Sequence, residues 1–150
     1  MIDEVVKELG NLAEEKKISL MFQRPQESPT NVMGDRDRSK EVLLNLCNNS
    51  IKYTDKGSVV ISIDKQSALV KILISDTGKG IPEENKSLLF RKFQQASNNI
   101  LTRDNTRSTG LGLYISKLLA EGMGGSITLE KSTIDVGSVF AFNLPLVPKA

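Results

Sequence analysis

The chain contains no histidine and no tryptophan, and it has a single cysteine. Without histidine it holds no His-based zinc site, no Ser/His/Asp triad and no Cys/His pair of its own. The single cysteine, Cys47, excludes an internal disulfide, and its apolar helical surroundings predict a small buried hydrophobic side chain. The apolar runs are short, far below the ~20 residues that a membrane-spanning helix needs, so we expect no direct membrane contact.

Charge of neither sign dominates the sequence. Twenty Lys and Arg face 18 Asp and Glu, for a formal net charge of +2. This balance leaves no large electrostatic footprint for nucleic acid, so an anion would be bound locally, by a few residues. Asp3, Glu4 and Lys7 interrupt the apolar pattern at the start, which excludes the core of an export signal. A length of 150 residues favours one domain over residues 1–150.

The spacing of apolar residues predicts an α+β fold. Helices are expected at residues 2–16, from Asp35 to about Tyr53, briefly after Pro82, and from Gly110 to Met123. Strands are expected at 18–23, 59–63, 69–75, 126–130 and 138–144, with a short edge strand at 31–33. Because two pairs of strands are adjacent as hairpins, we expect two layers, with helices packed on one face of a mixed, mostly antiparallel sheet.

The second predicted helix carries asparagines, which are poor helix formers. Asn45, Asn49 and Lys52 are spaced i, i+4, i+7 and fall within a sector of roughly 60° on one face. Each asparagine costs about 0.5 kcal/mol relative to alanine. Two explanations remain open: a solvated polar face on an ordinary amphipathic helix, or a polar face that binds a ligand.

Two glycine-rich segments add to this pattern. The segment 76–80 (Asp-Thr-Gly-Lys-Gly) follows a predicted strand, where glycines allow close backbone approach to a ligand and a carboxylate can accept from an exocyclic amine. The segment 108–113 opens a helix whose free N–H groups suit a phosphate, although no Gly-Lys-Ser/Thr follows as in a P-loop. Between them, residues 94–108 are polar and aperiodic, which predicts a long functional loop.

In this order the segments resemble the ATP-binding catalytic domain of sensor histidine kinases, in the GHKL superfamily with type II topoisomerase, mismatch-repair and heat-shock chaperone ATPases. Leu43 to Thr54 resembles the asparagine box, and Asp76 to Pro82 the first glycine box. Phe90 to Phe93 resembles the phenylalanine box, and Thr109 to Leu113 the second glycine box. The resemblance covers nearly the whole chain and implies a two-layer Bergerat-type ATP-binding fold.

The resemblance implies binding of ATP and Mg²⁺. Asp76 would hydrogen-bond the adenine amino group, Asn49 would coordinate the magnesium that bridges the phosphates, and Asn45 would lie beside it. Lys52 would approach the phosphates, and Tyr53 would flank the adenine or ribose. The implied catalytic residues are Asn45, Asn49 and Lys52.

The glycine boxes are implied to shape the nucleotide pocket and its lid. Gly78 and Gly80 would line the adenine, and Gly110 and Gly112 would let a lid of about residues 94–109 fold over the triphosphate. The full implied nucleotide-binding set is Asn49, Lys52, Tyr53, Asp76, Gly78, Gly80, Ile81, Phe93, Thr109, Gly110, Leu111, Gly112 and Leu113.

Position 45 separates reaction classes within the superfamily. Hydrolytic relatives carry a glutamate general base four residues before the magnesium-binding asparagine. Asn45 cannot take a proton, which favours phosphoryl transfer to an outside acceptor over hydrolysis. The resemblance implies that the acceptor is a histidine on a dimerisation domain of the same parent protein, with a response regulator downstream. We expect the isolated domain to be cytoplasmic, monomeric and unable to autophosphorylate alone, whether or not its parent is membrane-anchored.

Alternatives and departures accompany this interpretation. A non-catalytic nucleotide-binding docking module and a GHKL-type protein serine kinase are both compatible with the pocket. Ser108 and Asp135 stand where the family often has glycine. Phe90 and Phe93, at i and i+3, also fit an ordinary core stripe.

Overall fold

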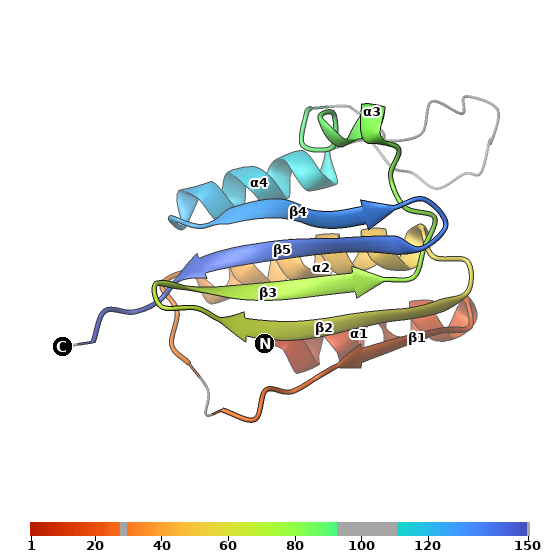
Figure 1. Ribbon diagram of the computed structural model, residues 1–150. Helices are drawn as coiled ribbons and strands as arrows, with labels where there is room; N and C mark the ends of the chain where they lie inside the picture. The colour runs from red at the N-terminus through yellow and green to blue at the C-terminus, as the bar shows by residue number, and fades with distance from the viewer. Residues whose placement is uncertain (28–29, 93–110, 150) are drawn as a thin grey trace.

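The computed structural model describes residues 1–27, 30–92 and 111–149. Its strands form a five-stranded sheet in the order β1-β2-β3-β5-β4, and helices cover one face (Figure 1). β1 pairs parallel with β2, and the other neighbours are antiparallel. The mixed, mostly antiparallel α+β sandwich predicted from the sequence is therefore confirmed. The strands are β1 (Ile18–Phe22), β2 (Gly57–Lys65), β3 (Leu69–Asp76), β4 (Ser126–Thr133) and β5 (Gly137–Pro145).

The helices of the described segments are α1 (Ile2–Glu15), α2 (Arg36–Lys52), α3 (Glu83–Lys86) and α4 (Gly112–Gly122). α2 is central and packs against both α1 and α4. It begins at the N-cap Asp35, whose side chain accepts from the Arg38 N–H at 2.9 Å and so satisfies one free donor of the first turn. None of the helices in these segments is long and apolar enough to cross a membrane.

The core lies between α2 and the inner face of the sheet. Leu43 and Leu46 of α2 are buried, as are Ile74 and Phe142 on the strands opposite. Each such side chain contributes about 1.5–3 kcal/mol through burial. Cys47 is fully buried among them, and this burial raises the pKa of its thiol to about 12, which confirms the prediction of a small buried side chain.

Several element ends differ from the prediction. β4 runs on to Thr133, through a bulge between Leu129 and Lys131 that disturbs the period-two alternation from which the strand was predicted. The edge strand expected at 31–33 is a single bridge, Val32 to Leu146. These differences lie in pairing details, which the local sequence does not specify.

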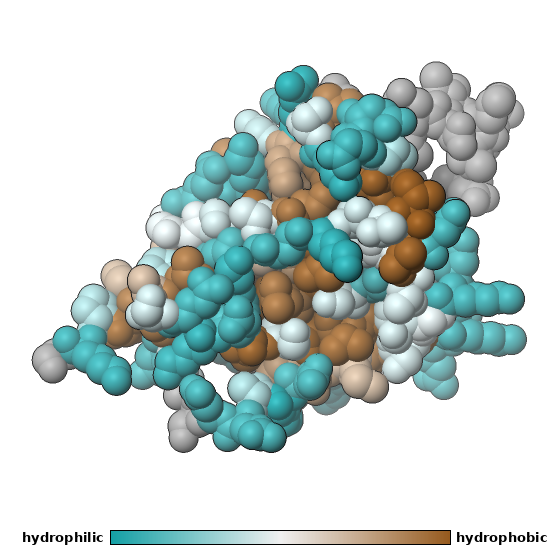
Figure 2. Space-filling view, viewed as in Figure 1, coloured by the Kyte–Doolittle hydropathy of each residue, from teal (hydrophilic) through white to brown (hydrophobic). Residues whose placement is uncertain are grey.

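The candidate site lies at one end of the sandwich. The C-terminal ends of α2 and β3, the β4–β5 turn and the first turn of α4 all lie there (Figure 1). Figure 2 shows apolar residues gathered at the β4–β5 turn and along the middle of the open sheet face, with hydrophilic residues around them. Ile134 and Val136 of that turn are half or more exposed.

Candidate functional site

Asp76, the last residue of β3, holds its carboxylate in one orientation. Its Oδ1 accepts from the Gly78 N–H at 2.9 Å and from the Ser138 N–H at 3.2 Å. The Ser50 hydroxyl of α2 also hydrogen-bonds this carboxylate. Two segments distant in sequence, α2 and β5, thus meet the turn after β3 at one side chain.

Burial raises the pKa of Asp76 above its ordinary value, although the hydrogen bonds from Gly78, Ser138 and Ser50 act in the opposite direction. Desolvation is the larger effect, so removal from water destabilises the charged form of this carboxylate. A partly desolvated acceptor interacts more strongly with a donor that reaches it than the same group in water does. A carboxylate of this kind suits recognition of an amine.

The turn that follows β3 packs directly on the end of α2. A Cβ at Gly78 would lie 2.5 Å from the main-chain oxygen of Tyr53 and 2.9 Å from Oδ1 of Asp76. The next residue, Lys79, donates its N–H to that same Tyr53 oxygen at 3.1 Å. No side chain fits at position 78, which explains its glycine sterically.

The β4–β5 turn covers the other side of this glycine turn. Gly80 has φ +72°, and a Cβ there would collide with the main chain of Thr133. The Asp135 N–H donates to the Lys79 carbonyl at 2.9 Å, and the Ile81 N–H donates to Oγ of Ser132 at 2.8 Å. The β4–β5 turn therefore packs against the glycine turn that follows Asp76.

Asp135 itself has φ +61°, in the left-handed region that Asp tolerates better than most residues. This is the position where the resembling family often has glycine, so the departure noted in the sequence leaves the turn intact.

The polar face of α2 reaches the site at its C-terminal end. Asn49 and Lys52 are half-buried, and Tyr53 is 38% exposed. The Nζ of Lys52 lies 5.3 Å from the centroid of the Tyr53 ring, in cation–π range. Burial lowers the pKa of Lys52. An anionic neighbour would therefore stabilise the charged form of this side chain.

Asn45 lies nearer the middle of α2 and is hydrogen-bonded to another helix. Its Nδ2 donates to Oγ of Ser116, a fully buried residue of α4, at 3.0 Å. This bond fixes the amide and joins the helix of the asparagines to the helix that follows the second glycine-rich segment.

The phenylalanine pair has one member among the described residues. Phe90 packs edge-on against Phe140, with ring centroids 6.4 Å apart and an interplanar angle of 85°. The core interpretation of Phe90 is thus confirmed. Phe93, Thr109 and Gly110, with the predicted lid at about 94–109, lie outside the described residues.

The start of α4 is described from Leu111. Leu111 is the N-cap, and its carbonyl accepts from the Ile115 N–H at 2.9 Å. Among the residues that the structure describes, none lies within 4 Å of a Cβ added at Gly112, so packing against them does not demand glycine there. Leu113 is half-buried against the core.

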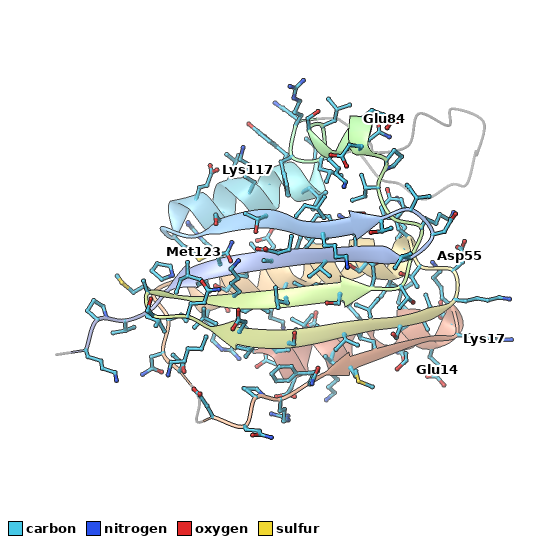
Figure 3. The ribbon with its side chains drawn as sticks, viewed as in Figure 1. Glu14, Lys17, Asp55, Glu84, Lys117 and Met123 are labelled. Atoms are coloured by element: carbon cyan, nitrogen blue, oxygen red, sulfur yellow. The ribbon has the colours of Figure 1, made fainter. Side chains whose placement is uncertain are left out.

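The structure brings the predicted residues that it describes toward one end of the fold, which the labels in Figure 3 help to locate. Asp55, in the turn after α2, and Glu84, in α3, lie toward this end, whereas Met123 lies at the opposite end (Figure 3). Asp76, Gly78, Gly80 and Ile81 follow one another along a single turn, which directly contacts Tyr53.

Sequence reasoning missed the support around Asp76. The Ser138 N–H and the Ser50 hydroxyl both bind its carboxylate, and a Cβ at Gly137 would collide with its main chain. The sequence pattern predicts Ser138 only as the first residue of a closing strand. The sheet register, which pairs Asp76 with Ser138, is the signal that would have found it.

A metal would have few protein ligands here. Among the residues that the structure describes, no group of three or more His, Cys, Asp or Glu is placed to hold a metal ion. The amide of Asn49 supplies the hard oxygen donor that magnesium accepts when most of its other ligands are waters and phosphates. The donor chemistry of this face therefore fits a nucleotide-bound magnesium ion better than a resident metal centre.

Residues 34–148 match the family model described as "Histidine kinase-, DNA gyrase B-, and HSP90-like ATPase". The chain belongs to this family. Within it, the chain is an ATP-binding catalytic domain of the sensor histidine kinase type. The resemblance stated from its sequence motifs is thus confirmed.

Two curated relatives illustrate the sequence similarity of this histidine kinase domain. It is 37% identical over 150 residues to the signal transduction histidine-protein kinase BarA of Escherichia coli (strain K12), covering 97% of this chain and 16% of the relative. It is 37% identical over 144 residues to the sensor histidine kinase GacS of Pseudomonas protegens, covering 91% of this chain and 15% of the relative. The domain spans only about a sixth of the length of such relatives.

Solved structures show the same architecture. The catalytic domain of histidine kinase ThkA, in a nucleotide-free form, gives a TM-score of 0.79 at 31% identity and covers 98% of this chain and 92% of that one. Full-length ShkA in complex with AMPPNP gives 0.83 at 26% identity, covering 99% of this chain and 30% of that one.

Proposed function

We propose that this domain binds ATP with Mg²⁺ and donates the γ-phosphate to a histidine on a separate dimerisation domain. The observation that carries the proposal is the partly desolvated carboxylate of Asp76, fixed by two main-chain N–H groups beside a turn where Gly78 excludes any side chain. The AMPPNP complex of ShkA, a structural relative, adds support for a nucleotide at this fold.

Asp76 recognises the adenine in this proposal. Its carboxylate accepts a hydrogen bond from the exocyclic amino group, an interaction in which a charged acceptor is stronger than a neutral one. The turn 78–81 lets the main chain approach the base, and Tyr53, exposed at the end of α2, flanks the base or the ribose.

The phosphates extend toward Lys52, Asn49 and the first turn of α4. Lys52 supplies a positive charge, and residues 111–113 supply N–H groups at a helix N-terminus, where an anion is favoured. Asn49 offers an amide oxygen to magnesium. When bound, magnesium neutralises charge that develops on the phosphates during transfer.

Asn45 supports transfer rather than hydrolysis. An amide cannot accept a proton from water, and the bond to Ser116 holds this amide against α4. In the proposed transfer, the bond between the γ-phosphorus and the ADP oxygen breaks as a phosphorus–nitrogen bond to the acceptor imidazole forms. This chain contains no histidine, so the acceptor belongs to another domain of the parent protein, with a response regulator as the next partner.

Calorimetric titration of ATP into the domain, with magnesium and with EDTA, tests the proposal. We expect micromolar affinity, roughly 8 kcal/mol of binding free energy. Asn49→Ala should lose the magnesium-dependent part of that affinity, whereas Asn48→Ala, at an exposed neighbour on the same helix, should keep it. Absence of binding by the folded protein would refute the proposal.

The acceptor is tested by adding a histidine-bearing dimerisation domain or a serine-bearing partner with γ-labelled ATP. We expect label on the first only, in an acid-labile form typical of a phosphorus–nitrogen bond. Label on serine would favour a GHKL-type protein serine kinase. Binding without transfer to either would favour a docking module controlled by nucleotide.

A further inference from the structure

The C-terminal turn of α2 ends without a left-handed glycine. Its C-cap, Tyr53, has φ −93° and ψ 6°. The Asn49 carbonyl accepts from the Tyr53 N–H at 3.0 Å, and the Ser50 carbonyl accepts from Oγ1 of Thr54 at 2.7 Å. These bonds satisfy two of the four carbonyls that a helix leaves free at its end.

Lys16 adds a charged donor to the other two carbonyls, of which the Ile51 carbonyl also accepts from the Thr54 N–H at 3.3 Å. Its Nζ donates to the Ile51 oxygen at 2.7 Å and to the Lys52 oxygen at 2.9 Å, both in partly buried surroundings. A cation at a helix C-terminus is also favoured by the helix dipole. The charged donor thus closes the end of α2 from outside the helix.

The α1–β1 turn delivers Lys16 to this place. Lys16 is the C-cap of α1, and the next residue, Lys17, has φ +58°, which reverses the chain into β1. Lys17 and Asp55 are labelled at the same end of the fold in Figure 3, where the turns after α1 and α2 lie. None of the nucleotide motifs includes this turn.

We propose that Lys16 is a positioning residue of the nucleotide site, which fixes the end of α2 on which the adenine-binding turn packs. The inference rests on the proposed function for its effect on ATP, and it extends that function to a residue outside the family motifs.

The packing gives the path from Lys16 to the adenine pocket. The carbonyl that follows the two bound by Lys16 belongs to Tyr53, and it accepts the Lys79 N–H at 3.1 Å. A side chain at position 78 would collide with that same Tyr53 oxygen. If the end of α2 loosens, the turn that holds the Asp76 carboxylate loses the surface against which it is packed.

Calorimetric titration of ATP into Lys16→Met tests this inference. Methionine keeps the unbranched apolar stem and removes the charge and the donors. We expect the Kd for ATP to rise about tenfold, with Lys16→Arg recovering most of the loss because the guanidinium still donates. Lys7→Met, at an exposed position on the same helix, is the matched control and should leave the Kd unchanged.

Amide hydrogen exchange in the nucleotide-free protein tests the structural step separately. Exchange of the Lys79 N–H should accelerate about tenfold in Lys16→Met while amides of the β3–β5 ladder keep their protection. A general loss of stability would accelerate both sets. If wild-type protein bound no ATP, the proposed function would fail, but this exchange difference would still stand or fall on its own.

An unchanged Kd together with unchanged Lys79 exchange in a folded Lys16→Met protein would overturn the inference. If that variant does not fold, Lys16→Gln replaces it, since its amide keeps a neutral donor. An intermediate rise in both Kd and Lys79 exchange would then support the positioning role, and wild-type values would overturn it.

Discussion

Asp76→Asn separates recognition from stability. Asparagine keeps the shape of the side chain, and its Oδ1 can still accept from the N–H groups of Gly78 and Ser138. The second position of the carboxylate changes from an acceptor to an N–H donor. Since the adenine amino group is itself a donor, the substitution places two donors against each other.

The loss of affinity follows from the charge of the bond. A hydrogen bond to a charged group contributes about 1.5–3 kcal/mol, so the Kd for ATP should rise roughly ten- to hundredfold. ATP affinity of the wild type should also fall in acid at a pH above the ordinary aspartate value of 3.8, because burial raises the pKa of Asp76. The acid decline should be absent from the variant.

Asp76→Asn should lower the affinity for ATP without lowering the free energy of unfolding. The folded-state pKa of Asp76 lies above its unfolded value, so folding stability falls as pH rises between the two. The cost of burying the charge is fully present above the folded-state pKa and is absent below 3.8. Asp76→Asn should therefore be at least as stable as wild type at pH 7, with the difference vanishing in acid.

Titration calorimetry at pH 7 and urea unfolding at several pH values measure the two effects. Asp64→Asn, an exposed aspartate on β2, is the control and should change neither. Wild-type affinity in Asp76→Asn would refute the adenine role. An affinity loss matched by an equal loss of stability would show that the carboxylate acts only in holding the turn.

Three further predictions concern the neighbouring residues. Gly78→Ala should lower the unfolding free energy by about 1–3 kcal/mol, because its Cβ would lie 2.5 Å from a main-chain oxygen. Gly10→Ala, in α1 where a Cβ would point into open space, should raise the unfolding free energy by about 0.5–1 kcal/mol. Equal effects of the two substitutions in thermal unfolding would contradict the steric argument. Ser116→Ala should cost about 1 kcal/mol and show coupling to Asn45→Ala in a double-mutant cycle; strict additivity would exclude their bond as a contributor. Because burial lowers the pKa of Lys52, ATP affinity should begin to fall at a pH below the ordinary lysine value of 10.5, and Lys52→Met should lack that alkaline decline.

Local patterns were sufficient to predict the elements of this fold. The apolar spacing of α2 and the alternation of β2 and β3 arise from burial on one face, which is written directly in the sequence. The extension of β4 was missed because its bulge depends on pairing with β5. Strand order was not predicted either, since it is decided by contacts between segments far apart in the chain.

The sequence singles out residues of the candidate site, but not the residues that hold them in place. Asp76 and Gly78 were found because a carboxylate and a glycine at a strand end carry a local chemical meaning. Ser138 and Lys16 act through a main-chain N–H and through two helix carbonyls, and neither role leaves a residue pattern at its own position. Such residues become visible only when the register and the helix ends are known.

The helices beside the site present opposite ends to it. α2 and α4 pack together, and the C-terminal end of α2 lies at the same end of the fold as the N-terminal end of α4 (Figure 1). A helix carries about half a positive charge at its N-terminus and half a negative charge at its C-terminus, so α4 attracts a triphosphate that an uncovered α2 would repel. Lys16 covers the last carbonyls of α2, and Lys52 adds a half-buried cation beside them. The proposed site can therefore hold an anion next to a helix end that disfavours one, and neutralising Lys52, which does not bind these carbonyls, should weaken phosphate binding more than adenosine binding.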